Sequence, residues 1–262
     1  MTSIKTSSEP PPGRSGLLGR LLAMVGLVAA LAGCATGPGV NPKDPFEPFN
    51  RSVSKFNEDL DRALLKPVAT VYRDVTPDPI RHGVTNFFGN LRDAWSSINS
   101  LLQLKPEAAI DNFMRFTVNS FFGLGGILDV ASEMNIDRHP EDFGQTLGRW
   151  GIPSGPYLVL PGLGSSTVRD TLAIGVEYSA RADLVRTTRD VAARNSLYVL
   201  RVVNGRSTVL NAGELIGNAA LDKYTFTRDA YLQIRRNQIN DGKDPDDDKE
   251  DPDDGKPAPA AK

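Results

Sequence analysis

The histidines and the acids near them are the residues of this chain best suited to acid–base or metal chemistry. The sequence holds only two histidines, His82 and His139, and neither has a second histidine or a cysteine at metal-ligand spacing. Glu141 and Asp142 follow His139 closely, which suggests a metal or acid–base cluster. Acids placed before a helix are explained more simply as its N-terminal cap. We therefore expect a structural role for these two acids.

Two other patterns fail as chemical motifs because of their context. Ser165 and Ser166 follow a glycine, but their neighbours do not form the Gly-x-Ser-x-Gly of a nucleophile elbow. Gly123-Leu124-Gly125-Gly126 follows a helical pattern, so it reads as a helix stop and not as a phosphate-binding loop. The chain also lacks a Walker A sequence. The sequence therefore predicts no enzymatic activity, no cofactor and no metal site.

The single cysteine, Cys34, stands at a position that indicates processing. Basic residues precede an apolar run from Leu21 to Ala32, which is too short to span a bilayer but typical of a signal-peptide core. The run ends in Leu31-Ala32-Gly33-Cys34, which resembles the lipobox of bacterial lipoproteins. By that resemblance residues 1–33 are a signal peptide, Cys34 carries covalent lipid, and Ala35 after it favours sorting to the outer membrane.

Composition divides the rest of the chain into three parts. Residues 34–45 are rich in Gly and Pro and are expected to form a tether. Residues 46–240 have the length of one domain. Residues 241–262 carry nine acids and four bases without a large apolar side chain, which predicts an acidic disordered tail. The central part has no broad basic surplus, so nucleic-acid binding has no support from composition.

Apolar residues at helical spacing dominate the central part. Phe49, Val53, Phe56 and Leu60, for example, share one face of a helix. No segment shows sustained strand-like alternation. The predicted class is all-α, a single helical domain with a small hairpin at 156–161. Helices are expected at about 49–60, 67–74, 80–91, 95–102, 106–122, 127–132, 143–150, 167–180, 184–191, 193–215 and 224–239.

The segment from Glu141 to Asp170 organises these helices. Its Gly and Pro residues interrupt a short helix, and an apolar stretch follows before Ser165 or Ser166 caps the next helix. One interpretation is a buried loop or a small buried strand pair. The other is a moving lid or pore lip, because glycine hinges beside rigid helices suit a mobile element.

Many polar residues lie among the aromatic residues of the helices expected between positions 80 and 122. One interpretation is a set of exposed and capping side chains on a small bundle. The other is a domain with one apolar surface and one surface that lines a wet cavity. The polar residues are Asn86, Asn90, Asn99, Gln103, Asn112, Arg115 and Asn119.

An ordered series of short strings resembles the VacJ/MlaA family of outer-membrane lipoproteins. The series covers roughly residues 44–178, with a weaker echo at 224–231. Its strings are Asp44-Pro45-Phe46-Glu47, Phe49-Asn50-Arg51, Lys66-Pro67-Val68-Ala69, Asn86-Phe87, Asn90-Leu91, Leu102-Gln103, Arg115-Phe116, Gly123-Leu124-Gly125-Gly126, Asp129-Val130-Ala131, Phe143-Gly144-Gln145-Thr146-Leu147-Gly148, Gly155-Pro156-Tyr157, Leu160-Pro161 and Arg169-Asp170.

The resemblance implies a helical disc in the periplasm-facing leaflet of the outer membrane, with a central amphipathic channel. Such a protein passes mislocalised phospholipid to a periplasmic lipid carrier and associates with a trimeric porin. Asp170, Asn119 and Asn86 are the candidate channel-lining residues. The residues of the expected pore-mouth hairpin are Gly151, Pro153, Gly155, Pro156, Tyr157, Leu160, Pro161 and Gly164.

Two other functions are compatible with a membrane anchor. A lipoprotein scaffold would bind a porin or the cell envelope without moving lipid, and the predicted anchor supports it equally well. A lipid-modifying hydrolase would work at the same membrane, but the chain has no convincing nucleophile and base. Lipid transfer separates a conduit from a scaffold, and release of fatty acid would reveal a hydrolase.

Overall fold

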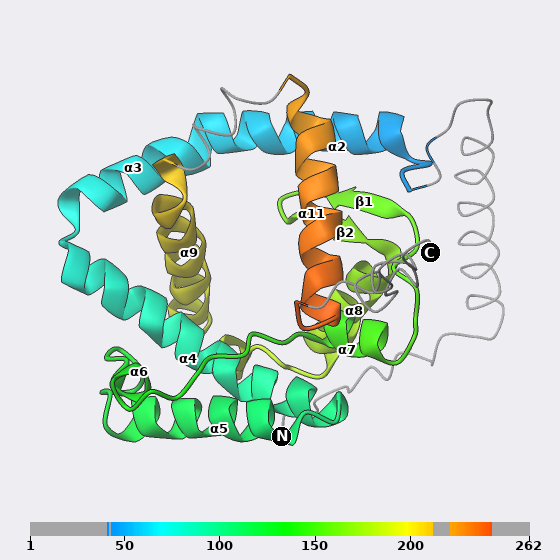
Figure 1. The fold of residues 1–262 in the computed structure, drawn as a ribbon. Helices are drawn as coiled ribbons and strands as arrows, with labels where there is room; N and C mark the ends of the chain where they lie inside the picture. Colours follow the sequence, from blue (N-terminus) through cyan, green and yellow to red (C-terminus); the bar gives the residue numbers. More distant parts are fainter. Residues whose placement is uncertain (1–40, 42, 212–220, 243–262) are drawn as a thin grey trace, which may run out of the picture.

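The computed structural model describes residues 41, 43–211 and 221–242. The predicted signal peptide, Cys34 and most of the predicted tether and acidic tail lie outside the described residues. Within that part the fold is mostly helical with one small antiparallel sheet, which confirms the predicted class. The elements follow one another around a ring-like outline in Figure 1.

The first helical segment is longer than the sequence predicts. Helix α2 (Glu47–Leu60) continues through a π-helical turn, η1 (Asp61–Leu65), into α3 (Lys66–Val75). Two separate helices were expected, with Pro67 marking the start of the second. Pro67 does lie in the first turn of α3, but the π-helical turn joins that helix to α2 without a break.

Helix α4 (Asp78–Leu102) replaces two predicted helices, at 80–91 and 95–102. The residues between them contain no Gly or Pro, and Asp93 is buried against Arg138, so nothing interrupts the helix there. A tight turn with Leu104 at φ +59° then leads to α5 (Pro106–Phe121), which packs along α4. The bounds of α5 differ from the prediction by one residue.

The middle of the chain contains short elements. Helix α6 (Val130–Glu133) begins three residues after the predicted start, and α7 (Phe143–Arg149) is capped by Asp142, whose side chain accepts from the Gln145 amide. Strands β1 (Tyr157–Leu160) and β2 (Gly164–Thr167) form an antiparallel pair in which Tyr157 is opposite Thr167. The hairpin therefore extends beyond the predicted 156–161.

Thr167 caps the helix that follows the hairpin, so the prediction of Ser165 or Ser166 as the cap was wrong. Those serines belong to β2. Helix α8 (Val168–Ser179) leads to a 3₁₀ turn, η2 (Leu184–Thr187), where an α-helix at 184–191 was expected. Helix α9 (Val191–Thr208) is shorter than the predicted 193–215, and residues 212–220 lie outside the described part.

The last described helix, α11 (Lys223–Ile239), matches the predicted 224–239 closely. It packs against α7 and β2, whereas α9 packs against α3 and α4. Figure 1 shows these two helices crossing between the elements of the outline, α9 from α3 to α4 and α11 from α2 to α7. The segments that hold the hairpin thus come from both ends of the domain.

Candidate functional site

Polar side chains dominate the buried parts of the described structure. The apolar core cluster is small and consists of Tyr157, Val159 and Tyr224 with a few partly buried neighbours. Between α4 and α5, Ser97 Oγ donates to the Ala109 carbonyl at 2.8 Å. Polar contacts of this kind are typical between helices that pack within lipid, because burying apolar side chains gives no hydrophobic stabilisation there.

The outward faces of the same helices are apolar. The exposed fractions of Val71 and Val75 on α3 are 61% and 72%, and those of Phe113 and Phe121 on α5 are 56% and 80%. Exposed apolar surface on this scale indicates a partner or a membrane. Further exposed apolar side chains around the outline are Phe49, Phe56, Leu64, Val68, Ile80, Ile110, Met114, Ile127 and Leu128.

The polar residues of α4 and α5 do not fit the interpretation as exposed side chains, and a wet cavity lined by them stays a prediction. Apart from Asn86, which is partly buried, they are buried and not exposed, yet they do not line the two cavities described below. They bond instead to other groups of α4 and α5 and to the segment that follows α5, up to α7. Asn112, for example, donates to the His139 carbonyl at 2.7 Å and accepts from the His139 amide at 3.0 Å.

A buried arginine connects α5 to the segment that follows it. Arg115 Nη2 lies 2.7 and 2.8 Å from the two carboxylate oxygens of Asp129. Burial would raise the pKa of Asp129, but hydrogen bonds from Ser132 and Asn119 and the charge of Arg115 lower it below its ordinary value. The ionised pair therefore fixes α6 against α5, and its role is structural.

Two asparagines of α2 hold the hairpin. Asn50 donates to the Tyr157 carbonyl at 3.0 Å and accepts from the Val159 amide at 2.9 Å. Two turns further along the same helix face, Asn57 donates to the Leu160 carbonyl at 3.0 Å and accepts from the Gly162 amide at 2.8 Å. These side-chain amides pair with the free edge of β1 as a neighbouring strand would.

The predicted hinge before the hairpin is also fastened. Gly151 and Gly155 adopt positive φ, so glycine is required at both turns. The Val168 and Arg169 amides at the start of α8 donate to the carbonyls of Pro156 and Ser154, each at 3.1 Å. The segment containing Pro153 is thus attached to α8 in this conformation. A pore-mouth role for the hairpin stays a prediction.

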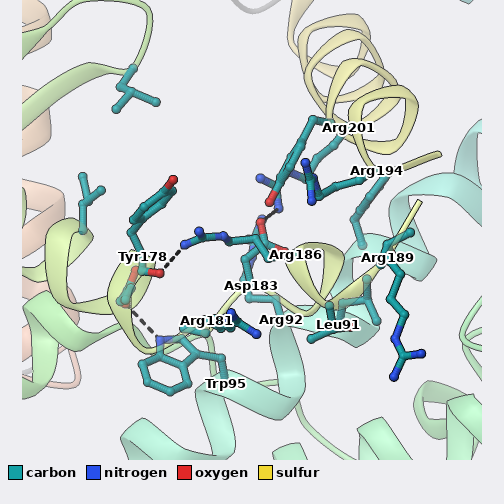
Figure 2. A pocket seen from close by; sticks show the side chains of 18 residues that line it. Leu91, Arg92, Trp95, Tyr178, Arg181, Asp183, Arg186, Arg189, Arg194 and Arg201 are labelled. Atoms are coloured by element: carbon teal, nitrogen blue, oxygen red, sulfur yellow. Dashed lines mark hydrogen bonds and ion pairs between the residues drawn. The ribbon is translucent and has the colours of Figure 1, made fainter. Parts of the chain in front are cut away.

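The larger of the two cavities described here lies between α4, α8 and α9 and has a volume of about 1130 Å³. Aromatic and aliphatic side chains, among them Phe88, Trp95 and Ile174, form part of its wall. Leu163 at the tip of the hairpin reaches the same cavity. Its charged lining, drawn in Figure 2, consists of Arg92, Arg181, Arg186, Arg189, Arg194 and Arg201 with the acids Glu177 and Asp183.

The acids of this cavity already have partners. Asp183 Oδ2 lies 2.8 Å from Arg201 Nη1. Glu177 Oε1 accepts from Trp95 Nε1 at 2.9 Å and from the Phe143 amide at 2.8 Å. Arg186 covers the ring of Tyr178 at 3.5 Å from its centroid. The lining thus combines cations and aromatic rings, a combination suited to an amphiphilic anion.

The second cavity lies on the other side of the hairpin and has a volume of about 650 Å³. Strand residues Tyr157, Val159 and Ser165 line it, together with polar residues of α2 and α11. The hairpin therefore contributes its tip to one cavity and its strands to the other. A shift of this element would change the shape of both.

The three candidate channel residues are held in different places. Asn119 donates to Asp129 at 3.0 Å and accepts from the Ala131 amide at 2.8 Å, which secures α6. Asn86 donates to the Ile127 carbonyl at 3.2 Å. Asp170 is buried between α8 and α11. None of them lines the two cavities described here, and a channel role for them stays a prediction.

Asp170 is the centre of a charged network. One of its oxygens accepts from Tyr231 at 2.8 Å, and Arg235 donates to both oxygens at 3.0 and 3.1 Å. Arg235 also binds Asp142, the cap of α7, at 2.7 Å. Burial would raise the pKa of Asp170, but the hydrogen bonds and charge of Arg235 outweigh it, so the pKa is lowered. The network joins α7, α8 and α11.

The residues first considered for chemistry have structural contacts. His139 Nε2 lies 3.1 Å from Asp111 Oδ2. Asp142 acts as the predicted cap, whereas Glu141 accepts from Gln103 Nε2 at 2.8 Å and from Lys105 Nζ at 2.9 Å. Within the described ranges, no group of three or more His, Cys, Asp or Glu residues is arranged to hold a metal ion.

The arginine-lined cavity was not predicted from the sequence. Its signal is the run of arginines between positions 181 and 201, within an otherwise nearly neutral domain. These residues reach the cavity from the turn after α8, from η2 and from α9, and Arg92 joins them from α4. Only the fold brings Arg92 to that group.

Comparison with known proteins agrees with this architecture. The MlaA lipoprotein family matches residues 42–238. The chain is 35% identical over 231 residues to the "Intermembrane phospholipid transport system lipoprotein MlaA" of Escherichia coli, covering 86% of this chain and 90% of that protein. The Haemophilus influenzae protein with the same description is 35% identical over 222 residues, with coverage of 82% and 88%.

An uncharacterized protein of Rickettsia bellii is 34% identical over 197 residues, which is 75% of this chain and 76% of that one. A solved structure from work on the "structural basis for maintenance of bacterial outer membrane lipid asymmetry" superimposes with a TM-score of 0.66 at 34% identity. It covers 75% of this chain and 98% of its own. The resemblance detected in the sequence is confirmed: this chain belongs to the MlaA lipoprotein family.

Proposed function

We propose that this lipoprotein removes mislocalised glycerophospholipid from the outer leaflet of the outer membrane and delivers it to a periplasmic lipid carrier. The lipid passes through a polar path enclosed by the ring of helices, with the hairpin at its mouth. Covalent lipid on Cys34 holds the protein in the periplasm-facing leaflet, and a trimeric porin gives it access to the outer one. The result is maintenance of lipid asymmetry.

The distribution of polarity is the observation that carries this proposal. Buried Asn, Ser and Arg side chains are hydrogen-bonded to other groups of the protein, while Val, Leu and Phe side chains face outward. None of the described helices has the length and hydropathy that a membrane crossing requires. A ring that lies within one leaflet satisfies both facts, because its apolar rim contacts acyl chains and its polar groups stay inside.

A conduit must also replace the water that a headgroup loses. Even one charged side chain at a bilayer centre costs roughly 2.5–3.5 kcal/mol on insertion scales. Cations and aromatic rings lie together in the larger cavity, where they can compensate for that loss. The named relatives belong to a phospholipid transport system, which agrees with this use of the cavity.

Deletion of the gene in its native cell, followed by add-back, tests the proposal. Outer-leaflet phospholipid, measured with a membrane-impermeant amine-reactive probe, should rise on deletion and return to normal with the wild-type gene. A Cys34→Ala gene should restore it poorly, because the protein is then not anchored. Unchanged outer-leaflet phospholipid after deletion would contradict the proposal.

Transfer in a purified system separates a conduit from a scaffold. The lipidated protein, placed in a bilayer with fluorescent phospholipid, should increase the amount of lipid captured by a soluble lipid-binding acceptor. A scaffold that binds only a porin or the cell envelope would leave that amount unchanged. Release of free fatty acid in the same mixture would indicate a hydrolase.

A further inference from the structure

The charge of the larger cavity exceeds what its ion pairs neutralise. Its lining holds six arginines and two acids, a formal surplus of four positive charges. In the described part of the chain, Arg92, Arg181, Arg189 and Arg194 have no carboxylate within ion-pair distance. Gathering unpaired guanidinium groups into one cavity is unfavourable unless an anion joins them.

The arginines reach this cavity from separate elements. Arg92 belongs to α4 and Arg181 follows α8, whereas Arg194 and Arg201 belong to α9. Figure 2 shows Arg194 and Arg201 close together, with Arg92 near Arg181 and with Arg189 pointing away from the others. Guanidinium groups bind phosphate through paired N–H donors, so a group of arginines without carboxylate partners is suited to a phosphate.

The wall beside the arginines is suited to a molecule with an apolar part. Phe88, Leu91, Trp95 and Ile174 line the same cavity. A volume of about 1130 Å³ exceeds what inorganic phosphate needs and lies above the usual range of small-molecule pockets. The lining therefore suits a molecule that combines a phosphate with an apolar body, as a glycerophospholipid does.

The charges of the lining bear on which headgroup the cavity suits. An ammonium headgroup needs a carboxylate or another free acceptor, but Asp183 is already paired with Arg201. Glu177 Oε1 accepts two hydrogen bonds from neutral donors, and this single carboxylate is outnumbered by the six arginines of the lining. The surplus of guanidinium groups would repel an added ammonium. A phosphate without an attached cation meets a lining with a net surplus of positive charge.

We propose that the cavity between α4, α8 and α9 is a headgroup site that selects anionic glycerophospholipids, such as phosphatidylglycerol, over zwitterionic phosphatidylethanolamine. Arg92, Arg181 and Arg194 supply the unpaired donors, and the aromatic wall holds the glycerol and the first part of the acyl chains. This inference rests on the proposed function, because it names the lipid class that the transport path prefers.

Competitive lipid binding tests the inference. The full-length lipidated protein is mixed with detergent micelles that contain equal amounts of phosphatidylglycerol and phosphatidylethanolamine, washed, and analysed for bound lipid by mass spectrometry. The wild type should be enriched in phosphatidylglycerol. In an Arg92→Gln, Arg194→Gln double variant, the ratio of bound phosphatidylglycerol to bound phosphatidylethanolamine should fall roughly tenfold. That factor is the effect of losing one charge-assisted hydrogen bond.

The two substitutions remove no partner of a buried carboxylate, so the variant should fold. A Lys55→Gln, Arg236→Gln variant is the matched control, because it removes the same charge from two exposed side chains, on α2 and α11, that do not line the cavity. The control should keep the enrichment. Equal enrichment in all three proteins, or equal amounts of both lipids on the wild type, would overturn the inference and leave the transport function standing.

Inorganic phosphate and glycerol 3-phosphate distinguish a lipid site from a site for free phosphate. Calorimetry should show that both bind much more weakly than the lipid, because neither contacts the apolar wall. If phosphate binds the wild type and not the double variant while both proteins retain the same lipids, the cavity is a phosphate site and the inference is wrong. A wild type that binds no lipid of either class would overturn both the inference and the proposed function.

Discussion

At the scale of single residues, Asp170 shows why a family resemblance and a local structure have to be considered together. The resemblance implies a channel residue, whereas the contacts are those of a buried ion-pair network with Arg235, Arg169 and Tyr231. The side chains of Asp170 and Arg235 are 7% and 11% exposed, so water does little to screen the pair. A change at this residue therefore affects the assembly of three helices.

Replacing Asp170 with Asn should destabilise the protein. Arg169 and Arg235 lose their shared charge partner, although Arg235 keeps Asp142. We therefore expect the free energy of unfolding to fall by about 3 kcal/mol, the lower end of the range for breaking a buried ion pair. Thermal or denaturant unfolding in detergent measures it. Asp59→Asn is the control, because Asp59 pairs with Lys55 at an exposed site and should change stability by no more than about 1 kcal/mol. Equal effects of the two substitutions would contradict this account of Asp170.

The same network predicts how stability depends on pH. The pKa values of Asp142 and Asp170 are lowered, because arginine hydrogen bonds and charge outweigh burial. Below the ordinary aspartate pKa of about 3.9 the unfolded chain binds more protons than the folded one. The two aspartates therefore stabilise the folded protein above about pH 3.9. This stabilisation is lost as the pH falls through their lowered pKa values. Melting temperatures measured across this range should fall less steeply for Asp170→Asn than for the wild type.

At the scale of elements, the hairpin depends on two asparagines that the sequence does not single out. Asn57 supplies both a donor to Leu160 and an acceptor for Gly162. Asn57→Ala removes both hydrogen bonds to the turn between β1 and β2. The turn should then open more often, because each such bond contributes about 0.5–1.5 kcal/mol to stability. Hydrogen exchange at the Gly162 amide should then become several-fold faster, while exchange in α4 stays unchanged.

An exposed asparagine of α9 provides the control for this experiment. Asn195 lies far along the chain from the hairpin, and Asn195→Ala should leave exchange at Gly162 as it is in the wild type. If Asn57→Ala has no effect on Gly162, then the hairpin is held by its own strand pairing. In that case the side-chain amides of α2 contribute nothing measurable to its position.

The elements also show what sequence patterns can predict. Helix α5 and helix α11 were located to within one residue, because Pro106 and the glycines after Phe121 mark one and a regular spacing marks the other. The two helices expected at 80–91 and 95–102 form one helix, α4, in which Asp93 is buried against Arg138. Ion pairs between distant segments leave no periodic signal.

The arginine cavity was missed for a related reason. The run between positions 181 and 201 was visible in the sequence, but a charged stretch usually lies on a solvated face. Its meaning depends on Arg92 and Trp95, which come from α4 and approach only in the fold. The family and the helical class could be predicted without any knowledge of such contacts, since ordered motifs and helical spacing are local properties of the sequence.

At the scale of the whole molecule, polarity is distributed as in a protein that lies partly in lipid. The peripheral helices present Val71 and Phe113 outward with exposed fractions of 61% and 56%, and polar groups fill the contacts between helices. An acyl anchor alone would not need this arrangement, because tethered soluble domains expose few large apolar side chains in groups. The rim itself should therefore bind membranes.

A chain without Cys34, the residue proposed to carry covalent lipid, tests the rim directly. Expressed without residues 1–34, the protein should still float with phospholipid vesicles in a density gradient. Val71→Asp together with Phe113→Asp should abolish flotation, because a charge inside the bilayer costs up to roughly 2.5–3.5 kcal/mol. Both residues are exposed, so the variant should keep its helical circular dichroism. Asn195→Asp adds a charge at an exposed polar site and should float like the parent, whereas flotation of all three proteins alike would show that the apolar rim does not determine membrane binding.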